Sequence, residues 1–481
     1  MATAIPRNHV EVMAQSVAAA TGGVVLRGRD KRARGVVSDT RAMAGGEAFV
    51  ALRGAQQDGH VFLGEAAARG AELLVVEREG SVPDGPDVVC VSDTLTAWGD
   101  LARAHAKAWR SARADRRMIA ITGSAGKTTT KQLCAALLAE VAETHATPGN
   151  LNNLVGVPAV VFALEPRHRF AVVECGMSVR GEIAALASIV HADVSIITNV
   201  SVAHAEGVGG TREDVAREKG ALFDALGEDG VCVYDADDAI GRVLAARCKA
   251  TRKLGFGRAS DAAYRLARRV SLGLAGSRVT LERPVANGAR ESLELRLPFV
   301  GEAAAIDLCA ALAAADAAAG VLPNDAIIRA LDGVQNVAGR VALHETDSGI
   351  LVIDDSYNAN PASMRSALSV LVDLGQERRR VAVLGEMKEL GACAPDEHRA
   401  LGDAIAAAGV ALVVGCGGLA THVVARAKAL GVDAIDCESV DEATRVALER
   451  TRSGDVVLVK GSRSTGTERV VLALMKNRGA P

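Results

Sequence analysis

The chain has 481 residues, 49% of them hydrophobic and only 2% aromatic, and its formal net charge is −3. This length exceeds one ordinary hydrophobic core, so we expect two to four domains. The near-neutral charge argues against a broad surface for nucleic acid or for an anionic membrane. The nine cysteines form no C-x-x-C pair. They therefore suggest neither a zinc site nor a disulfide framework, and they fit a reducing, cytoplasmic compartment.

No targeting or membrane-spanning segment is predicted. The first residues lack the basic stretch and apolar run of a signal peptide. The longest apolar stretch, 303–322, contains Asp307 and Asp316, so we interpret it as an Ala-rich buried helix rather than a membrane span.

Residues 1–93 are predicted to form a small α/β domain. Strands are expected at 36–37, 48–52, 72–76 and 88–91, with a helix at 63–69 and a connecting helix from 94 to 111. Ser38, Asp39, Thr40 and Arg41 follow the first of these strands. They could bind an anion or a nucleotide, but by themselves they are more simply a turn capped by its own side chains.

Residues 94–335 are predicted to form a central domain organised around the segment 119–130. An apolar strand runs into Gly123-Ser-Ala-Gly126-Lys127-Thr128, and a helical pattern continues over 131–138. Strand, glycine-containing turn, lysine and hydroxyl are the features of a phosphate-binding loop at a helix N-terminus. The full loop pattern has a glycine where Ile121 stands, and the alternative is a glycine-rich turn capped by threonines.

Several polar residues follow later strands of this domain. The strand 170–174 ends at Glu174, which is either a metal ligand or a charge at the start of the helix 181–189. His204 lies beyond the strand 194–200. Lys219 lies on the inward face of the helix 212–226, and its stem could instead cover apolar surface while its head reaches water. The turn 147–153 contains Asn150, Asn152 and Asn153, which either cap the next segment or contact a polar ligand.

The remainder of the central domain is predicted to change character. Strands at 277–283 and 291–297 flank a turn at 287–288 and indicate an antiparallel section. The Ala-rich helix follows at 303–320, and a short helix is expected at 324–331.

Residues 336–481 alternate strands and helices. Strands are expected at 350–353, 380–384, 412–414 and 456–459, and helices at 363–374, 397–408, 419–430 and 441–452. This alternation predicts a doubly wound, Rossmann-like parallel sheet. The fold class is therefore α/β with three domains, the central one resembling a P-loop ATPase with a mostly parallel sheet. Polar strand ends in two domains suggest one cleft between them.

The phosphate loop and the strand-end carboxylate imply ATP with Mg²⁺. They do not identify the acceptor, which leaves a kinase, a motor or switch ATPase, or a ligase that activates a carboxylate. Polar residues at the strand ends of the third domain favour a substrate with carboxylate and amine groups. From the residues alone, ligase and kinase remain close.

A set of motifs spread over all three predicted domains resembles the Mur ligase family, which builds the peptidoglycan stem peptide. The motifs are Ser38-Asp-Thr-Arg41, Asp58-Gly-His-x-Phe62, Thr122-Gly-Ser-Ala-Gly-Lys-Thr-Thr-Thr130, Gly149-Asn-Leu-Asn-Asn153, Glu174-x-Gly176, His204, Lys219, Gly339-Arg340, Asp354-Asp-Ser-Tyr-Asn-Ala-Asn-Pro361 with Ser363-Met364, Gly385-Glu-Met-x-Glu-Leu-Gly391 and Lys460-Gly-Ser-Arg463.

The resemblance implies an ATP-dependent ligase of cytoplasmic cell-wall synthesis. Within the family, the motifs look most like those of the members that add D-alanyl-D-alanine to UDP-N-acetylmuramoyl-tripeptide through an acyl phosphate. Such an enzyme would act as a monomer on small-molecule substrates, without nucleic acid or membrane insertion. The alternatives are a Mur-type ligase for another stem-peptide step and a nucleotide-binding homologue with reduced activity.

The resemblance also implies roles for individual residues. Catalysis would depend on Lys127, Glu174, His204 and Lys219. Thr128 and Glu174 would serve one Mg²⁺, and His204 and a carbamylated Lys219 a second. The nucleotide would be held by Gly123, Ser124, Ala125, Gly126, Lys127, Thr128, Thr129, Arg340 and Asp355. Ser38, Thr40 and Arg41 would hold the UDP end of the substrate, whose other contacts would be Asn150, Asn152 and Asn153. Asn358 and Asn360 would contact the incoming peptide.

The sequence departs from the family where adenine is expected to bind. Ala303 and Ala304 stand in place of a His-Asn pair, so backbone groups or Asp307 would have to substitute. Asp235 replaces an asparagine before Ala-Asp-Asp. Glu218 precedes Lys219 where a small residue is usual, which would put a negative charge near a carbamate.

Overall fold

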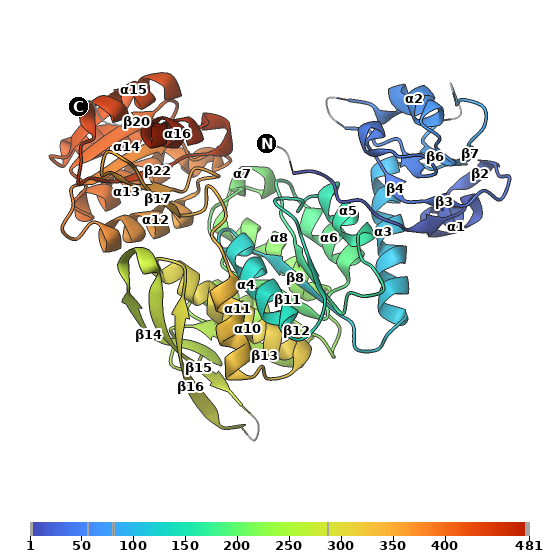
Figure 1. Ribbon diagram of the computed structural model, residues 1–481, viewed down its shortest axis with the longest axis horizontal. Helices are drawn as coiled ribbons and strands as arrows, with labels where there is room; N and C mark the ends of the chain where they lie inside the picture. Colours follow the sequence, from blue (N-terminus) through green and yellow to red (C-terminus); the bar gives the residue numbers. More distant parts are fainter. Residues whose placement is uncertain (1–2, 55–56, 79, 81, 286–287, 477–481) are drawn as a thin grey trace.

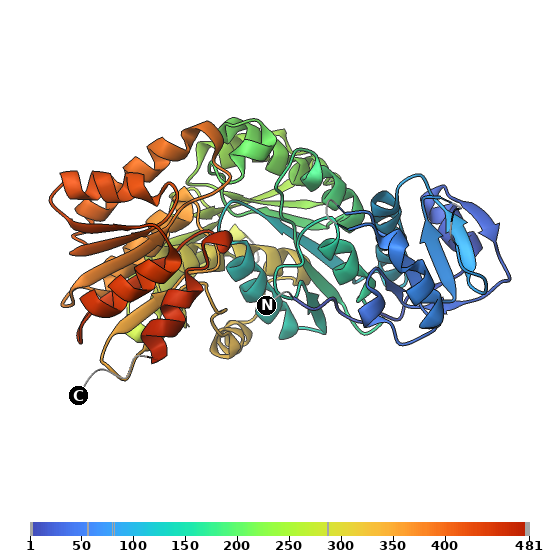
Figure 2. The same cartoon turned by 90° about the horizontal axis from the view of Figure 1, so that it is seen from above.

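The structure is a computed structural model that describes residues 3–54, 57–78, 80, 82–285 and 288–476. The chain forms an elongated α/β molecule in which a small N-terminal sheet and a C-terminal sheet flank a central one (Figures 1 and 2). These sheets contain five, six and nine strands, respectively. The predicted three-domain α/β class is confirmed.

The N-terminal sheet has the strand order β2-β7-β6-β5-β4. All its neighbours are parallel except the pair β2–β7, and a separate antiparallel pair joins β1 to β3. The elements, in chain order, are β1 (Glu11–Val12), α1 (Ala14–Thr21), β2 (Val24–Arg27), β3 (Ala33–Arg34), β4 (Val36–Val37), β5 (Ala48–Val50), α2 (Leu63–Ala68), β6 (Leu73–Val76), β7 (Asp87–Cys90) and the long helix α3 (Thr94–Ser111). The first four of these elements were not predicted from the sequence.

The central sheet has nine strands in the order β16-β15-β14-β13-β12-β11-β8-β10-β9. Its first part consists of β8 (Arg117–Thr122), α4 (Lys127–Ala139), β9 (Thr144–Ala146), α5 (Gly156–Phe162), β10 (Phe170–Glu174), α6 (Glu182–Val190), β11 (Val194–Ile197), α7 (Ala205–Val208), α8 (Arg212–Asp224), β12 (Val231–Asp235), α9 (Ala239–Arg247) and β13 (Arg252–Gly257). The neighbouring strands in the part of the sheet with the order β13-β12-β11-β8-β10-β9 all pair in parallel.

Helices cover both faces of this sheet because β8 is apolar on both sides. Met118 and Ala120 belong to one buried cluster, which contains side chains of α3, α5, α6 and α8. Ile119 and Ile121 belong to the other, which contains side chains of α4, α10 (Glu302–Ala319) and α11 (Asn324–Gly333). A continuous apolar run of this kind is typical of a parallel strand buried between two helical layers.

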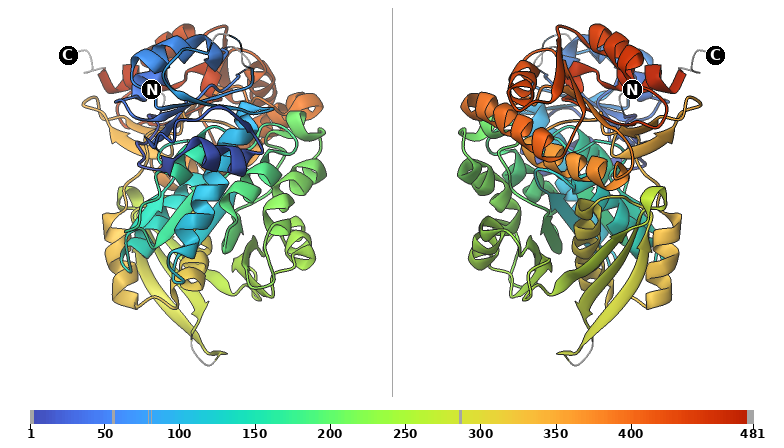
Figure 3. Two further views of the ribbon diagram at one scale, coloured as in Figure 1. Left: turned by 90° about the vertical axis from the view of Figure 1, so that its right-hand side faces the viewer. Right: turned by 90° about the vertical axis from the view of Figure 1, so that its left-hand side faces the viewer.

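An antiparallel arm extends the central sheet through β14 (Tyr264–Ser271), β15 (Ser277–Pro284) and β16 (Arg290–Leu297). Figure 3 shows this arm on the side of the central sheet away from the N-terminal sheet. The register pairs Ser277 with Leu297, which confirms the predicted antiparallel section. Position 287 of the predicted turn lies outside the described residues. The strands β9, β13 and β14 were not predicted.

The C-terminal sheet has the order β17-β18-β22-β19-β20-β21 and is parallel except for its antiparallel edge strand β17. Its main elements are β17 (Ala342–Glu345), β18 (Leu351–Asp354), α12 (Pro361–Leu374), β19 (Arg380–Gly385), α13 (Ala394–Ala407), β20 (Leu412–Cys416), α14 (Ala420–Ala429), β21 (Asp433–Cys437), α15 (Val440–Arg450), β22 (Val456–Lys460) and α16 (Glu468–Lys476). The doubly wound prediction is confirmed, although the edge strands β17 and β21 were missed.

The Ala-rich helix α10 packs inside the central domain. Its positions 308–315 are all fully buried, and Asp316 near its end is 6% exposed. Among the described residues, no helix combines the length and hydropathy needed to cross a bilayer. Burial within the protein therefore explains the apolar character of this stretch.

Candidate active site

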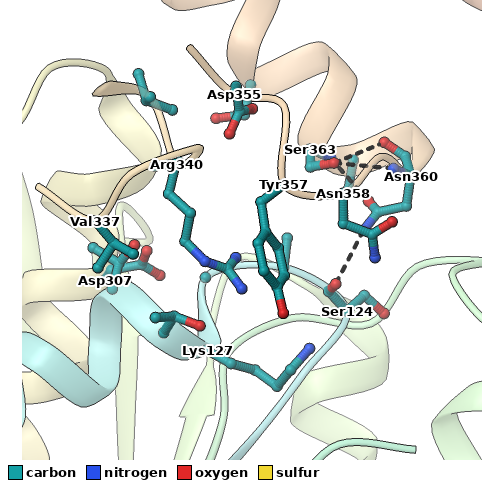
Figure 4. A pocket seen from close by; sticks show the side chains of 18 of the residues that line it. Ser124, Lys127, Asp307, Val337, Arg340, Asp355, Tyr357, Asn358, Asn360 and Ser363 are labelled. Atoms are coloured by element: carbon teal, nitrogen blue, oxygen red, sulfur yellow. Dashed lines mark hydrogen bonds between the residues drawn. The ribbon is translucent and has the colours of Figure 1, made fainter. Parts of the chain in front are cut away.

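One cavity of about 480 Å³ lies where the central and C-terminal sheets face each other. The loop before α4 and residues beyond β10 and β11 line one side of it. Arg340, residues after β18 and Lys460 at the end of β22 line the other. Figure 4 shows side chains of both domains pointing into this space. The predicted cleft at the carboxyl ends of two sheets is therefore present.

The loop between β8 and α4 requires glycine at two positions. Gly123 has φ 151° and Gly126 has φ 80°. A Cβ at Gly123 would lie 1.8 Å from Thr198 Oγ1, and a Cβ at Gly126 would lie 2.4 Å from Asp307 Oδ1. Glycine is thus needed for both conformation and space.

Asn199 fixes the same loop from the end of β11. Its main-chain oxygen accepts from the Ser124 amide, and its side chain both accepts from the Ala125 amide and donates to the Ala125 carbonyl, at 3.0 Å in each case. Thr198 Oγ1 also donates to the Ala125 carbonyl at 2.5 Å. Neither Thr198 nor Asn199 was predicted as a site residue, although both directly follow a buried strand.

Lys127 begins α4 and folds back over the loop, where its Nζ donates to the Gly123 carbonyl at 2.7 Å. Burial lowers the pKa of Lys127, and Glu174 opposes this change. The ammonium group lies in the cavity at the start of a helix, where an anion would be stabilised.

Glu174 is fully buried at the end of β10 and is surrounded by donors. Thr128 Oγ1 donates to its Oε2 at 3.0 Å, and Asn152 Nδ2 donates to its Oε1 at 2.8 Å. Lys131 Nζ lies 3.5 Å from Oε2. Burial opposes ionisation of Glu174, but Lys131 and Lys127 hold its pKa below the ordinary value. This carboxylate is therefore ionised at neutral pH.

Thr128 and Glu174 fit a Mg²⁺ site completed by phosphate oxygens. Their oxygens are 3.0 Å apart and line the same cavity as Lys127. A hydroxyl and a carboxylate are hard oxygen donors, which Mg²⁺ prefers. Within the described part of the chain, no group of three His, Cys, Asp or Glu side chains forms a metal-binding cluster.

Lys219 lies in the cavity wall with only 1% of its surface exposed. Burial places its pKa well below the ordinary lysine value, and Lys127 lowers it further. The Lys219 side chain has no hydrogen bond or ion pair among the described residues. The head of this lysine does not reach bulk water, in contrast to the surface alternative considered from the sequence.

Glu218 points away from the lysine that follows it. Its two carboxylate oxygens accept from the Gly181 and Ile183 amides at the start of α6, at 2.8 and 2.9 Å. It therefore caps a neighbouring helix. This contact explains how a glutamate is accommodated beside Lys219.

His204 links the two domains around the cavity. Its Nδ1 contacts the Glu389 carboxylate, which belongs to the loop after β19 in the C-terminal domain. Both residues have left-handed backbones, with φ 61° and 62°. Such conformations are uncommon for residues with a side chain and concentrate at functional sites.

The C-terminal domain contributes Arg340, Asp355 and Tyr357 to the cavity. The Arg340 guanidinium lies 4.3 Å from the centre of the Tyr357 ring, and Figure 4 shows the two side chains next to each other above Lys127. Burial raises the pKa of Asp355, although Lys460 Nζ donates to its Oδ2 at 2.5 Å.

Asn358 and Asn360 both line the cavity, but their side chains already have partners. Asn360 Oδ1 accepts from the Ser363 amide and caps α12, and its Nδ2 donates to the Ser124 carbonyl at 3.1 Å (Figure 4). Asn358 Oδ1 accepts from the Ala359 amide. Asn360 thus fastens the C-terminal domain directly to the phosphate loop.

The remaining predicted substrate residues lie at different places. Asn152 and Asn153 line the main cavity, whereas Asn150 lines an adjoining one. Ser38, Thr40 and Arg41 belong to the N-terminal domain and line neither of these cavities. Asp39 accepts from the Arg41 side chain, whose exposed fraction is 85%.

The region predicted for adenine is lined by Ala303, Ala304 and Asp307 at the start of α10. Burial raises the pKa of Asp307 to about 8, and the negative charge of Asp235 adds to this effect. Burial likewise raises the pKa of Asp235 to about 6. Because its pKa is about 8, the Asp307 carboxyl group is largely protonated at neutral pH. It can therefore donate a hydrogen bond as an asparagine amide would.

Comparison with known proteins covers nearly the whole chain. Residues 32–107 match the profile "Mur ligase family, catalytic domain", residues 121–315 the "Mur ligase middle domain" and residues 339–463 the "Mur ligase, glutamate ligase domain". The UDP-N-acetylmuramoyl-tripeptide–D-alanyl-D-alanine ligase of Escherichia coli (strain K12) is 34% identical over 94% of this chain and 96% of its own length.

Solved structures agree with the sequence relatives. MurF from Acinetobacter baumannii superimposes with a TM-score of 0.86 and 29% identity, covering 98% of this chain and 100% of that one. MurF from Thermotoga maritima, in complex with ADP, has a TM-score of 0.80 and 25% identity, covering 92% and 97%. The chain therefore belongs to the Mur ligase family, and within that family to the MurF ligases.

Proposed function

We propose that this chain is an ATP-dependent ligase that joins D-alanyl-D-alanine to UDP-N-acetylmuramoyl-tripeptide in cytoplasmic peptidoglycan precursor synthesis. The observation that carries the proposal is one cavity that combines the phosphate loop and Glu174 with Arg340 and Asp355 of the facing domain. Similarity to ligases with this reaction extends over 94% of the chain. A kinase is disfavoured because those relatives are ligases.

The phosphate loop and Lys127 would hold the β- and γ-phosphates of ATP. Lys127 would exchange its bond to the Gly123 carbonyl for phosphate oxygens. Thr128 and Glu174 would hold Mg²⁺, which neutralises the charge that develops on the transferring phosphoryl group. Arg340 and Asp355 would contact the phosphates and the ribose from the C-terminal domain, and the cavity would then exclude water from the reacting groups.

The reaction proceeds in two transfers. A terminal carboxylate oxygen of the tripeptide attacks the γ-phosphorus, and the bond from phosphorus to the bridging oxygen of ADP breaks. The amine of D-alanyl-D-alanine then attacks the carbonyl carbon of the acyl phosphate. The carbon–oxygen bond breaks, inorganic phosphate leaves with the electron pair, and the amine releases its proton. Phosphorylation is required because a carboxylate alone is a poor electrophile.

Lys219 would enter this chemistry as a carbamate. Its lowered pKa favours the neutral amine, which is the form that adds to carbon dioxide with loss of a proton. The product carries a negative charge in place of a positive one. With His204 it would serve a second Mg²⁺. The Glu218 carboxylate is bound at α6, and its charge raises the pKa of Lys219, but burial has the larger, opposite effect.

The three domains would divide the remaining tasks. The N-terminal domain, 1–93, would hold the UDP end through Ser38, Thr40 and Arg41. The central domain, 94–335, would hold ATP, and Asn150, Asn152 and Asn153 would guide the stem peptide toward Lys127. The C-terminal domain, 336–481, would close over the nucleotide and receive the dipeptide. Asn358 and Asn360 would line its path, with Asn360 also securing the phosphate loop.

ADP release tests the proposal. We expect release from ATP and Mg²⁺ only when UDP-N-acetylmuramoyl-tripeptide and D-alanyl-D-alanine are both present. Release with neither substrate would indicate a simple ATPase. No release with both would indicate a nucleotide-binding homologue. Release only with another amino acid would indicate a different stem-peptide step.

A further inference from the structure

A loop of the C-terminal domain lies against the central domain beside the nucleotide cavity. This loop, residues 386–391, follows β19, and it contacts the segment 202–206 at the start of α7. The Glu206 amide donates to the Glu389 carbonyl at 3.3 Å. Val202 packs against the buried cluster of the central domain and also against that of the C-terminal domain. Main chain and apolar side chains therefore fix the loop on this segment.

Glu389 is held in place by buried neighbours on both sides. Met387 and Leu390 are each 1% exposed and belong to the hydrophobic core of the C-terminal domain. The Met387 amide donates to Nε2 of the buried His398 at 2.9 Å. The Glu389 side chain, in contrast, is about half exposed and leaves the loop on its outer side. The loop thus presents this carboxylate to the central domain from an anchored main chain.

His204 is presented to the C-terminal domain in the same manner. Its neighbours Ala203 and Ala205 are buried, whereas its own ring is partly exposed and lines the nucleotide cavity. Glu389 contacts its Nδ1, and no other side chain among the described residues bonds to this ring. The orientation of the imidazole therefore depends on a carboxylate from the other domain.

The contact also determines which nitrogen of His204 carries the hydrogen. A half-exposed carboxylate is ionised at neutral pH and can only accept, so Nδ1 donates to Glu389. In the neutral ring the lone pair then lies on Nε2, at the other edge of the imidazole. Because His204 lines the cavity, Nε2 is the nitrogen left for a ligand there.

Stabilisation of the fold is the alternative role for this contact. A partly exposed pair of side chains contributes little to stability. The left-handed backbones of His204 and Glu389 cost free energy rather than supply it. Packing between the domains comes from the buried residues on either side of the pair. The arrangement therefore favours orientation of the imidazole over stabilisation of the fold.

We propose that Glu389 is a positioning residue for His204, supplied to the reaction by the C-terminal domain. The proposal rests on the proposed function, in which His204 serves the second Mg²⁺. Lys127, Glu174 and His204 all belong to the central domain, whereas Glu389 belongs to the domain that would receive the dipeptide. The His204 ring is oriented only while the loop 386–391 lies on the central domain. Phosphoryl transfer therefore depends on the placement of the C-terminal domain.

The first test compares Glu389→Gln and Glu389→Met in ADP release with both substrates. Methionine is similar in length but cannot accept from Nδ1. It should lower kcat by about 10- to 100-fold and raise the Mg²⁺ concentration for half-maximal release, without changing KM for D-alanyl-D-alanine. Glutamine keeps an acceptor oxygen and should retain part of kcat. Glu449→Gln is the matched control, because Glu449 is an exposed glutamate of α15 that pairs with Arg445, and it should behave as the unmodified protein.

The second test detects the position of the hydrogen on His204 without turnover. Protein with ¹⁵N-labelled histidine is examined by NMR at alkaline pH without substrates, and His204→Gln assigns the signals. We expect the hydrogen on Nδ1 in the unmodified protein and in Glu389→Gln, and a mixture of both tautomers in Glu389→Met.

Unchanged kcat and tautomer in Glu389→Met would contradict the proposal. A higher KM for the dipeptide at unchanged kcat would assign Glu389 to substrate binding and would also contradict it. Absence of turnover in the unmodified protein would reject the proposed function. The NMR signals would still show in that case whether Glu389 orients His204.

Discussion

Helix α10 carries a buried aspartate near each of its ends, and the two lie in different polar surroundings. Asp316 accepts from Arg283 Nη1 at 3.1 Å, from the Tyr264 hydroxyl at 3.0 Å and from the Leu322 amide at 2.9 Å. The other Arg283 donors are bound by Glu291, the Leu322 carbonyl and Asn324. Each group in this cluster has a protein partner.

The end of α10 that lines the cavity is organised in the opposite way. Asp307 lies against Gly126. The same cavity contains the basic side chains of Lys127, Lys219 and Arg340, and none of these three forms an ion pair within 4.0 Å among the described residues. The comparison shows that burial of charge alone does not identify an active site. A buried charge without a protein partner, inside a cavity, indicates a site prepared for a ligand.

The largest expected effect is at the phosphate loop. Lys127→Ala should reduce ADP release by at least about 10³-fold, because the transferring phosphoryl group loses its main cation. Thermal unfolding should change little, since Lys127 makes only one hydrogen bond to its own loop. The control is Lys253→Ala, an exposed lysine of β13 that should remain fully active. Retained activity in Lys127→Ala would exclude the loop from catalysis.

Substitutions around Asp316, at the other end of α10, should change the stability of the protein rather than its activity. Arg283→Met leaves Asp316 buried without its cation and should lower the free energy of unfolding by about 3–5 kcal/mol. Adding Asp316→Leu should recover much of that loss. Arg278→Met, at an exposed position of the same strand, should stay within about 0.5 kcal/mol. Chemical denaturation measures the free energy of unfolding of all three variants. An unchanged denaturation midpoint for Arg283→Met would contradict a stabilising role of the Arg283–Asp316 pair.

Variants of Lys219 test whether this buried lysine is converted to a negatively charged carbamate. Lys219→Ala should lower turnover by about 10²–10³-fold. Short carboxylic acids such as acetate should restore part of the activity, whereas chloride at equal ionic strength should not. Lys127→Ala is the matched variant that carboxylic acids should not rescue. Failure to rescue Lys219→Ala would count against the carbamate.

Asp307 should make stability depend on pH. Its pKa is about 8 in the folded protein and close to 3.8 in the unfolded chain, so the folded state binds the extra proton between these values. The free energy of unfolding therefore falls as pH rises from 4 to 8. Asp307→Asn should remove this loss and be more stable than the unmodified protein by about 1–3 kcal/mol at pH 8. If the unmodified protein and Asp307→Asn show the same dependence of unfolding free energy on pH, Asp307 binds no extra proton in the folded state between pH 4 and 8.

Much of the fold could be predicted from local patterns in the amino-acid sequence. The alternation of apolar strands and helices after residue 336 predicted the C-terminal sheet, and the strand before Gly123 predicted the phosphate loop. The short edge strands β9, β17 and β21 were missed because they have few residues and mixed exposure. Such strands are fixed by pairing with a neighbour rather than by their own sequence.

The site could be predicted only where a residue follows a strand end or matches a family motif. Lys127, Glu174 and Lys219 were found in this way, and all three line one cavity. Asn199 was missed because the strand was predicted to continue over 194–200, whereas β11 ends at Ile197 and leaves Asn199 beyond the strand end, against the loop that follows β8. The use of Glu218 as a cap for α6 was equally hidden, since its partners lie 35 and 37 residues away.

The path of one oxygen atom tests the central claim most directly. UDP-N-acetylmuramoyl-tripeptide with ¹⁸O in its terminal carboxylate is incubated with ATP, Mg²⁺ and D-alanyl-D-alanine, and the inorganic phosphate is examined by mass spectrometry. Transfer of phosphate to the peptide carboxylate predicts one ¹⁸O atom in each phosphate released. Phosphate without ¹⁸O would mean that water, not the tripeptide, receives the phosphoryl group, and would contradict the account.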